Sequence, residues 1–211
     1  SSDTTAASAA GTGNECTVGK TLEANTLTIG TGNPAYSPWV DNDAPESKEG
    51  FEAAVAYAVA AELGFADTAV KWVRTGFDEA IQPGVKNFDF NLQQYTITDE
   101  RKKVIDFSDK YYNSPAEIIG TKDAANVTVV DNPDGKGGKI ANPADLKGKT
   151  IGVQTATIHA DYAAKYFKDA TVKVYDTADN HNADLVAGRI DYALLDSVAA
   201  DDFVKANAAK G

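Results

Sequence analysis

The chain has 211 residues and a hydrophobic fraction of 43%, which is ordinary for a folded protein and leaves room for one large or two small domains. Its 20 Lys and Arg are outnumbered by 31 Asp and Glu, so the net charge is −11 and neither nucleic acid nor an anionic membrane surface is expected as a partner. The longest apolar run, residues 53–61, is far shorter than the roughly 18 residues that a membrane-spanning helix needs.

The start of the chain is rich in Ser, Thr, Ala and Gly, so we expect residues 1–20 to be a flexible N-terminal tail. Such a tail resembles the tether of a processed exported lipoprotein, and a vector-derived sequence is an equally good alternative. The single cysteine, Cys16, is either an inert thiol or half of a disulfide bond whose partner lies elsewhere. His159 and His181 are the two histidines and have no cysteines around them, so no metal ion or other cofactor is expected.

The first half of the sequence alternates strand and helix patterns, which is typical of a parallel sheet. Strands are predicted at residues 27–30 and 70–74, with a helix at residues 51–63 that ends before Gly64. The apolar spacing predicts that this helix buries one face, formed by Phe51, Val55, Val59 and Leu63.

Two loops that follow these strands carry aromatic side chains. The loop at residues 31–39 contains Tyr36 and Trp39, which either stack on a ligand or pack in the core of the domain. Phe77 follows the second strand and joins the candidate site. Because ligands of parallel sheets collect at the carboxyl ends of the strands, we expect these rings near a binding site.

The stretch at residues 88–112, FDFNLQQYTITDERKKVIDFSDKYY, carries the most specific signal. Residues 88–92 predict a short buried strand that leads into a polar step. Thr98 has the position of an N-cap, so a helical turn should begin there and bring Thr96 and Arg101 into one space.

A hydroxyl, backbone N–H groups and a guanidinium at a strand end suit a small carboxylate, which arginine grips with two parallel hydrogen bonds. This pattern makes Arg101 the first candidate for a ligand contact. The alternative is a surface arginine that forms an ordinary ion pair with Asp99 or Glu100.

The second half of the sequence repeats the alternation of strand and helix. Residues 116–121 are expected to be extended, residues 123–146 to be rich in loops, and Asp196 to expose its carboxylate or cap the helix that follows it. Thr157 is a natural N-cap, and the N–H groups of the helix after it would meet an anion. The predicted strands are residues 149–153, 172–175 and 190–195, and the predicted helices are residues 158–167, 180–187 and 197–205.

Three motifs in the same order and with the same spacing as in one known family carry a resemblance: KNFDFNLQQYTITDERKKVIDFSDKYY, DLKGKTIGVQTATIHADYAAKYF and LVAGRIDYALLDSVAA. From residue 27 to about residue 206 the chain resembles the type II periplasmic solute-binding proteins of the polar amino-acid family (bacterial extracellular solute-binding protein family 3), which catch ligands for ABC importers. The resemblance implies an α/β fold with two lobes, each a mostly parallel sheet flanked by helices, and a ligand cleft between the lobes. It divides the chain into lobe one at residues 21–114, a hinge strand at residues 115–120 and lobe two at residues 121–211.

The resemblance also implies roles for individual residues. Arg101 would hold the carboxylate of an amino acid together with Thr96 and the N–H of Thr157 or Ile158. Asp196 and the carbonyl oxygen of Gln94 would bind the ammonium group. The resemblance places Tyr36, Trp39 and Phe77 around the ligand side chain, with Gln154 and His159 facing it from lobe two. Gln93 and Gln94 are also expected to bind the ligand, and together with Asn33 and His159 they suggest that its side chain is polar.

On this basis the protein is expected to be a monomeric binding protein and not an enzyme, with no catalytic residue. It would bind an L-amino acid or a related small polar solute and deliver it to an ABC transporter permease. Its expected place is extracellular or periplasmic, with membrane contact only through an N-terminal lipid anchor. Two other functions on related folds are a dehydratase like cyclohexadienyl dehydratase, with Asp196, Glu117 or His159 as the acid, and an extracellular ligand-sensing domain.

Two features depart from the family pattern. Many relatives carry an acidic residue just after the first strand, where this chain has Gly32 and Asn33, so the specificity of basic amino-acid binders does not carry over. Family members also continue beyond the equivalent of Gly211 with a strand and helices that return to lobe one. That return segment is expected to be missing from this sequence, as in a fragment, an incompletely recorded chain or a truncated relative.

Overall fold

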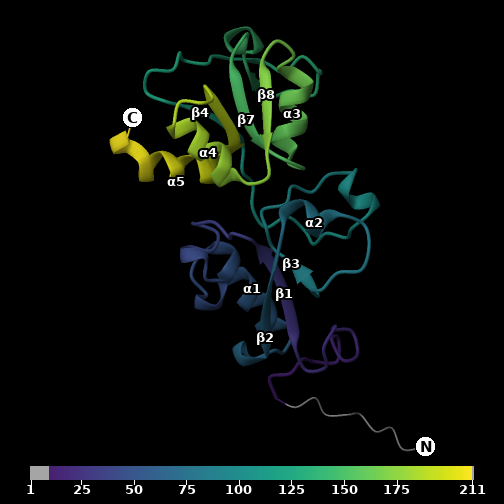
Figure 1. The fold of residues 1–211 in the computed structure, drawn as a ribbon. Helices are drawn as coiled ribbons and strands as arrows, with labels where there is room; N and C mark the ends of the chain where they lie inside the picture. Colours follow the sequence, from purple (N-terminus) through teal and green to yellow (C-terminus); the bar gives the residue numbers. More distant parts are fainter. Residues whose placement is uncertain (1–9, 211) are drawn as a thin grey trace, which may run out of the picture. The chain divides into compact units, whose positions relative to one another are not determined.

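The structure is a computed structural model that describes residues 10–210 and separates into two compact units. Unit 1 ends at Lys110 and unit 2 begins at Tyr111 (Figure 1). Each unit has its own sheet and its own helices.

Unit 1 is built on a parallel sheet of three strands in the order β2-β1-β3. The strands are β1 (Leu27–Gly32), β2 (Val70–Thr75) and β3 (Phe90–Asn91). Ile29, in the middle of β1, pairs with Trp72 on one side and with Phe90 on the other. Because the three strands are parallel, their carboxyl ends lie at one edge of the sheet, which we call the carboxyl edge of unit 1.

Helix α1 (Phe51–Glu62) packs on this sheet with small side chains, which differs from the expected apolar face. Phe51 and Val59 are 41% and 37% exposed, whereas the buried residues of the helix are Glu52, Ala53, Ala56 and Ala60. Alanine lets the helix approach the strands closely. Val55 and Leu63 of the predicted face are partly buried against the same cluster, so the prediction is confirmed for these two residues and is wrong for Phe51 and Val59. The remaining helices of unit 1 are α2 (Phe77–Ile81) and the short turns η1 (Asp41–Asp43), η2 (Pro45–Ser47), η3 (Asp67–Ala69) and η4 (Arg101–Lys103).

Part of the expected N-terminal tail is attached to unit 1. Thr12 forms a β-bridge with Phe65, and the N–H of Gly13 donates to the carbonyl oxygen of Gly64 at 2.9 Å. The side chain of Thr17 is buried and accepts from the N–H of Asn14 at 2.8 Å. These contacts attach residues 12–17 to the turn after α1, which differs from the flexible tail expected there. Residues 1–9 lie outside the described part of the chain.

Unit 2 contains a four-stranded sheet in the order β4-β9-β7-β8, in which only β4 is antiparallel to its neighbour. Its strands are β4 (Ala116–Gly120), β7 (Thr150–Gln154), β8 (Thr171–Tyr175) and β9 (Tyr192–Asp196). Helices α3 (Ile158–Tyr166), α4 (Ala178–Val186) and α5 (Ser197–Asn207) alternate with the strands, and the short turns are η5 (Pro143–Leu146) and η6 (Ala208–Lys210).

The sheet of unit 2 is buried on both faces. Along β9, Leu194 belongs to a cluster with Phe167 after α3, while Leu195 belongs to a cluster with Leu185 of α4 and Ala200 of α5. In Figure 1, α3 accordingly lies on one side of β7 and β8, and α4 and α5 lie on the other. Burial on both faces explains why residues 190–195 read as an apolar run and not as an alternation.

A network around Asp184 ties α4 to β8. This carboxylate accepts from Lys173 Nζ at 2.8 Å, from the hydroxyl of Tyr175 at 2.6 Å and from Arg189 Nε at 2.6 Å. These hydrogen bonds, with that from Lys173 first, hold the pKa of Asp184 well below its ordinary value. Asp184 therefore stays ionised and keeps the helix and the edge strand together.

The loop-rich region of unit 2 contains an antiparallel hairpin that the sequence did not predict. Strand β5 (Val129–Asp131) pairs with β6 (Lys139–Ala141) across a turn with several glycines. The Asn, Pro and Gly residues at positions 132–138 predicted the turn correctly, whereas each strand has only three residues and gives no periodic signal.

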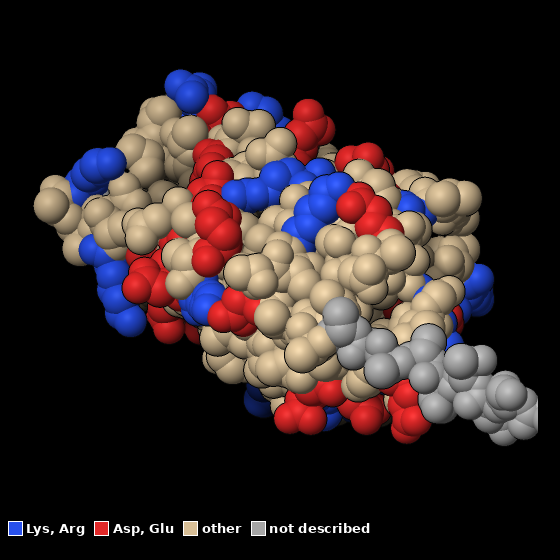
Figure 2. Space-filling model, turned by 90° about the horizontal axis from the view of Figure 1, so that it is seen from below, with Lys and Arg blue, Asp and Glu red and all other residues tan. Residues whose placement is uncertain are grey.

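The charged groups of the surface are mixed in sign. On the face seen in Figure 2, Lys and Arg side chains lie beside Asp and Glu side chains. Many of the ion pairs are exposed, such as Lys103 with Glu100 at 2.6 Å, and such pairs add little stability. None of the helices within residues 10–210 has both the length and the apolar sequence that crossing a lipid bilayer requires.

Candidate functional site

The carboxyl edge of unit 1 gathers most of the site residues predicted in the first half of the chain. Phe77 begins α2 directly after β2, and the segment from Gln93 to Arg101 follows β3. The loop that contains Tyr36 and Trp39 follows β1. Parallel strands therefore bring together residues that are far apart in the sequence.

Arg101 is held in a defined position at this edge. Its Nη1 donates to the carbonyl oxygen of Thr96 at 2.8 Å, and its guanidinium carbon lies 5.7 Å from the ring centres of both Phe77 and Tyr95. Thr98 supports the turn, because its hydroxyl oxygen accepts from the N–H of Arg101 at 3.2 Å. Thr96 thus contacts Arg101 through its backbone carbonyl. The ligand contact predicted for its hydroxyl stays a prediction. A cation over two aromatic faces is stabilised and oriented at once.

The acidic neighbours of Arg101 lie close to lysines. Glu100 forms an ion pair with Lys103 at 2.6 Å, and Asp99 lies 3.9 Å from Lys102. Both are pairs at spacing i and i+3 on an exposed turn, where the energy gained is small. These pairs place Asp99 and Glu100 in surface contacts of the ordinary kind.

Tyr95 belongs to the site and was missed in the sequence. Its ring centre lies 4.4 Å from that of Phe77, and its hydroxyl donates to the carbonyl oxygen of Phe77 at 2.6 Å. Burial raises the pKa of Tyr95 well above its ordinary value, so the hydroxyl remains a donor. The only sequence signal was its position between Gln94 and Thr96, in a step that otherwise read as polar.

Gln93 is committed to the interior of unit 1. Its side chain is buried, its Oε1 accepts from the hydroxyl of Thr75 at 3.2 Å, and the same Oε1 lies 3.3 Å from the hydroxyl oxygen of Tyr95. Asn91 Nδ2 extends the chain by donating to the hydroxyl oxygen of Thr75 at 3.1 Å. Gln93 therefore lies beside Tyr95 inside unit 1. The ligand contact expected for it stays a prediction.

Gln94 turns towards helix α1. Its backbone adopts φ +53°, a left-handed conformation that side chains other than glycine rarely take. Its N–H donates to Glu52 Oε1 at 2.9 Å, and its side-chain Nε2 donates to Glu52 Oε2 at 2.5 Å. The side chain is thus occupied by Glu52, which leaves the backbone carbonyl as the part of Gln94 for which a ligand role is expected.

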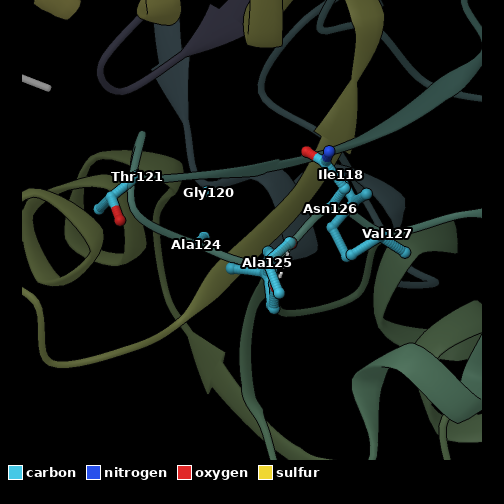
Figure 3. Close-up of a pocket in the computed structure, with 8 residues that line it drawn as sticks. Ile118, Gly120, Thr121, Ala124, Ala125, Asn126 and Val127 are labelled. Carbon is cyan, nitrogen blue, oxygen red and sulfur yellow. Dashed lines mark hydrogen bonds between the residues drawn. The ribbon is translucent and has the colours of Figure 1, made fainter.

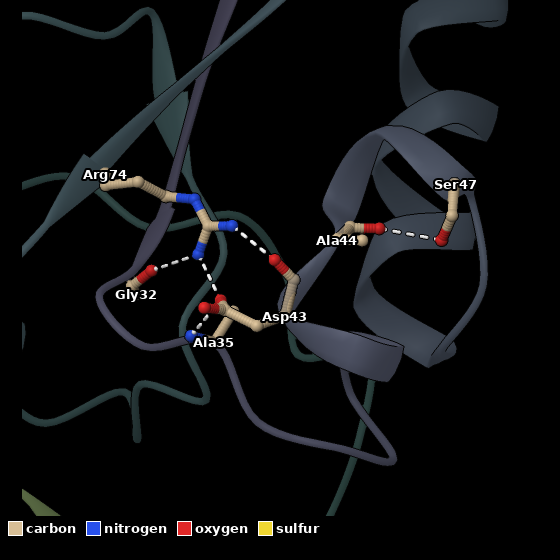
Figure 4. Close-up of polar contacts among 6 residues, drawn as sticks. All are labelled: Gly32, Ala35, Asp43, Ala44, Ser47 and Arg74. Atoms are coloured by element: carbon tan, nitrogen blue, oxygen red, sulfur yellow. Dashed lines mark hydrogen bonds and ion pairs between the residues drawn. The ribbon is translucent and has the colours of Figure 1, made fainter.

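The loop after β1 is fastened by Arg74 and Asp43. Arg74 donates from Nη1 to the carbonyl oxygen of Gly32 at 2.9 Å and from Nη2 to that of Asp43 at 2.5 Å, and it forms an ion pair with the Asp43 carboxylate (Figure 4). The same carboxylate accepts from the N–H of Ala35 at 2.8 Å. Although partial burial raises it, the hydrogen bonds from Arg74 and Ala35 hold the pKa of Asp43 below its ordinary value.

The two aromatic residues of this loop differ in exposure. Trp39 is only 4% exposed, and its ring meets that of Phe51 edge-on with centres 5.8 Å apart. Tyr36 is half-buried. Of the two interpretations given for Trp39, core packing is the one that fits unit 1, since a ring with so little free surface offers no face for stacking.

In unit 2, the predicted residues lie where β7 and β9 end. Thr157 caps α3: its hydroxyl oxygen accepts from the N–H of Ala160 at 3.1 Å, and its hydroxyl donates to the carbonyl oxygen of Gln154 at 2.6 Å. Ile158 and His159 then form the first turn of α3, whose N–H groups lack acceptors within the helix. The cap predicted for Thr157 is confirmed, and the helix start has the polarity that favours an anion.

Asp196 ends β9 and caps α5. Its Oδ1 accepts from the N–H of Ala199 at 3.1 Å and from the hydroxyl of Ser114 at 3.2 Å. The cap predicted for Asp196 is therefore confirmed. The side chain is half-buried, so a carboxylate oxygen with more than one acceptor position stands at the carboxyl edge of the unit 2 sheet.

A hollow of about 300 Å³ lies elsewhere in unit 2 (Figure 3). It is lined by the segment that follows β4, including Thr121 and Asn126, and by Tyr192. Tyr192 pairs with Gly120 at the beginning of β9, whereas Asp196 stands at the other end of this strand. The hollow therefore contains none of the residues predicted to bind a ligand. Within residues 10–210, no group of three or more His, Cys, Asp or Glu could hold a metal ion.

Comparison with known proteins identifies relatives over almost the whole described chain. Residues 27–205 match the model of the bacterial extracellular solute-binding proteins, family 3. The L-arginine-binding protein of Pseudomonas aeruginosa is 36% identical over 181 residues, which are 84% of this chain and 64% of that protein. The chain thus spans about two thirds of the length of this curated relative.

Solved structures share the fold. An ancestral arginine-binding protein bound to arginine has a TM-score of 0.67 at 31% identity, with 88% of this chain and 76% of that chain covered. The ancestral amino acid-binding protein AncCDT-1, described as a precursor of cyclohexadienyl dehydratase, has a TM-score of 0.66 at 30% identity, with 85% of this chain and 74% of that chain covered. The α/β fold and the family resemblance expected from the sequence are confirmed. The chain belongs to the bacterial extracellular solute-binding proteins of family 3.

Proposed function

We propose that this protein binds a small amino acid outside the cell membrane and delivers it to the permease of an ABC importer. The observation that carries the proposal is the position of Arg101, fixed by the Thr96 carbonyl and by the rings of Phe77 and Tyr95 at the carboxyl edge of unit 1. A guanidinium whose direction is set before the ligand arrives loses little freedom on binding, so it suits a planar carboxylate.

In this proposal, residues of unit 2 also contribute to the affinity for the amino acid. The first turn of α3, at Ile158 and His159, offers backbone N–H groups and a positive helix end to the carboxylate. Asp196 offers an anionic oxygen to the ammonium group, as does the carbonyl oxygen of Gln94 in unit 1. A zwitterion needs one fixed cation and one fixed anion, and Arg101 and Asp196 supply them.

L-Arginine is the first ligand to test, because the relative from Pseudomonas aeruginosa and the ancestral structure are both named for arginine binding. Gly32 and Asn33 stand where many relatives carry an acidic residue, so other polar amino acids belong in the same screen. The protein acts as a monomer in this proposal, and residues 1–9 would lead to a lipid anchor.

A thermal-shift screen of the common amino acids tests the proposal. A ligand at 100 times its dissociation constant stabilises the folded state by about 2.7 kcal/mol, which is a measurable rise in the melting temperature. We expect at least one amino acid to produce this rise in the unchanged protein and none to produce it in Arg101→Ala. If no amino acid, small carboxylic acid or polyamine raises the melting temperature, the proposed function is wrong.

A dehydratase is the second candidate, because AncCDT-1 is described as a precursor of cyclohexadienyl dehydratase. Elimination from a cyclic acid needs a carboxylic acid that donates a proton, and Asp196, Glu117 and His159 are the candidates on the sequence. Incubation with prephenate or arogenate, followed by detection of an aromatic product, separates the two functions. We expect no product.

A further inference from the structure

A buried carboxylate lies behind the predicted ligand site of unit 1. Glu52 is only 1% exposed and belongs to the first turn of α1. It is 42 residues away from Gln94 in the sequence, yet its two carboxylate oxygens accept the backbone N–H of Gln94 at 2.9 Å and the side-chain Nε2 of Gln94 at 2.5 Å. A buried charge is costly to desolvate, so a carboxylate in this place requires such partners.

The residue that Glu52 holds is where the chain changes direction after β3. The backbone of β3 pairs with β1 as far as the N–H of Leu92, which donates to the carbonyl oxygen of Gly30 at 3.1 Å. Two residues later Gln94 has φ +53°, which is unfavourable for any residue with a Cβ atom. The conformation must therefore be held by outside contacts, and the two bonds to Glu52 supply them.

The direction of the chain after Gln94 decides where Tyr95, Thr96 and Arg101 lie. Tyr95 follows at once and provides a ring beneath the guanidinium, and Thr96 provides the carbonyl oxygen that accepts from it. Burial raises the pKa of Tyr95 most and Arg101 lowers it, and the negative charge of Glu52 adds to the rise. Glu52 thus holds the residue that comes directly before Tyr95 and Thr96. These two residues supply two of the three contacts that orient Arg101.

We propose that Glu52 is a positioning residue: by clamping Gln94 in its left-handed conformation, it directs Tyr95 and Thr96 so that Arg101 points at the carboxylate of the ligand. The inference rests on the proposed function for its consequence on affinity. It does not place Glu52 in contact with the ligand, because this side chain is only 1% exposed and turns both oxygens towards Gln94.

The competing explanation is that Glu52 only stabilises α1. Gly50 at the N-cap has no side chain to cap the helix, and a carboxylate in the first turn favours the positive helix end. Both roles predict a less stable protein when Glu52 is removed. They differ in what a glycine at position 94 does, since glycine adopts positive φ without a side-chain penalty but restores nothing to α1.

Four variants separate these roles: Glu52→Ala, the double variant Glu52→Ala with Gln94→Gly, Glu52→Gln, and the control Glu49→Ala, which removes an exposed carboxylate just before the same helix. Titration calorimetry with L-arginine and the other common amino acids gives the affinity of each. Nuclear magnetic resonance of the Arg101 Nε–Hε group, without ligand, reports the ring currents of Phe77 and Tyr95 and so the position of the guanidinium.

We expect Glu52→Ala to lower the affinity at least tenfold, which corresponds to about 1.4 kcal/mol, and to move the Arg101 signal towards that of a free side chain. The double variant should recover most of the affinity and the original signal. Glu52→Gln, which keeps an acceptor for the N–H of Gln94, and Glu49→Ala should stay within about threefold of the unchanged protein.

An unchanged Arg101 signal in Glu52→Ala, or a double variant that recovers neither readout, would overturn the inference in favour of the helix-capping role. If the unchanged protein binds no amino acid, the proposed function fails and the Arg101 signal alone decides whether Glu52 positions Arg101. If Glu52→Ala does not fold, Gln94→Val tests the same link, because a β-branched residue resists the left-handed conformation. The Arg101 signal should then move in Gln94→Val and stay in Gln94→Gly.

Discussion

Tyr95 and Phe77 form one unit beneath the guanidinium of Arg101. The hydroxyl of Tyr95 donates to the carbonyl oxygen of Phe77 at 2.6 Å, and the two ring centres are 4.4 Å apart. The hydrogen bond fixes the tyrosine ring relative to the start of α2, so the two faces are presented to Arg101 together. Phe77 comes from the segment after β2 and Tyr95 from the segment after β3, so the hydrogen bond joins two segments that are separate in the sequence.

Tyr95→Phe tests this link. The substitution keeps the ring but removes the hydroxyl, which leaves the carbonyl oxygen of Phe77 without this donor. We expect the free energy of unfolding to fall by about 1 kcal/mol and the affinity for an amino acid to fall only slightly. Urea unfolding measures the first and calorimetry the second. An unchanged midpoint of unfolding would mean that the hydrogen bond contributes nothing to stability.

Arg101→Ala should lower the affinity strongly. Loss of one partner from a desolvated charge pair costs roughly 2–5 kcal/mol, which is about 30-fold to several thousand-fold in the dissociation constant. Arg101→Lys should also bind weakly, because a point ammonium cannot replace the planar fork. Calorimetry gives both values, and Lys102→Ala, one residue away on the same exposed turn, is the control that should bind normally.

The free energy of unfolding of the unliganded variants completes this test. We expect Arg101→Ala to change it by about 0.5–1 kcal/mol, because the half-exposed guanidinium packs on the two rings but is not part of the core. If Arg101→Ala binds the ligand with near-native affinity, Arg101 is an ordinary surface arginine and does not hold the ligand. A loss of several kcal/mol without ligand would make its role structural.

The sequence predicted those parts of the fold that depend on local chemistry. Strands with continuous apolar runs, such as residues 190–195, and caps with an oxygen-bearing side chain, such as Thr157 and Asp196, were identified because each is recognisable within a few residues. The short strands β5 and β6 were not, because three residues carry no period.

Contacts between distant segments could not be read in the same way. The fully buried residues of α1 are mostly alanines, so only Val55 and Leu63 of the predicted face pack against the core, while Phe51 and Val59 are exposed. The expected site included Arg101 but not Tyr95, because a lone tyrosine in a polar step gives no sign of the phenylalanine that it meets. The burial of Glu52 has no signal in the sequence around it, since its partner Gln94 lies 42 residues further on.

Arg74→Ala should loosen the loop that follows β1. The substitution removes the donors to the carbonyl oxygens of Gly32 and Asp43 and breaks the ion pair with the Asp43 carboxylate. The arginine side chain is partly exposed, so we expect a loss of about 1–2 kcal/mol in the free energy of unfolding.

Hydrogen exchange localises this effect. The N–H of Ala35, which donates to Asp43, should exchange faster in Arg74→Ala, while amides of α3 in unit 2 should not change. Lys71→Ala is the matched control, because Lys71 lies on the same strand, β2, as Arg74 and forms only an exposed ion pair with Glu23. That control should lose less than about 1 kcal/mol. Equal losses in the two variants would contradict a special role for Arg74.

His181 should make unit 2 sensitive to acid. This side chain is 1% exposed and faces the ring of Tyr175, and burial lowers its pKa from 6.5 to about 4. Below pH 6.5 the unfolded chain takes up a proton that the folded chain does not, so stability falls as the pH drops from about 6.5 to about 4. The loss over this window is up to about 3 kcal/mol.

Urea unfolding of the unchanged protein and of His181→Gln at several pH values measures this effect. The difference in unfolding free energy between the two proteins should shrink as the pH falls through this window and then stay constant. Asp184 affects stability in a lower pH range. Because its pKa is lowered in the folded protein, the stability that it contributes is lost only as the pH falls below the ordinary carboxylate pKa. Parallel curves for the two proteins between pH 7 and pH 4 would show that His181 does not titrate as described.

The attachment of residues 12–17 to the turn after α1 makes Cys16 a specific handle. Cys16 is the only cysteine of the chain, it is exposed, and its N–H donates to the side-chain oxygen of Asn14 at 2.9 Å. A maleimide dye would therefore label each molecule once, on a backbone that is fastened to unit 1 through Thr12 and Phe65. A single cysteine introduced in unit 2 would form a pair with Cys16 for distance measurements by energy transfer. No other cysteine of this sequence would have to be removed first.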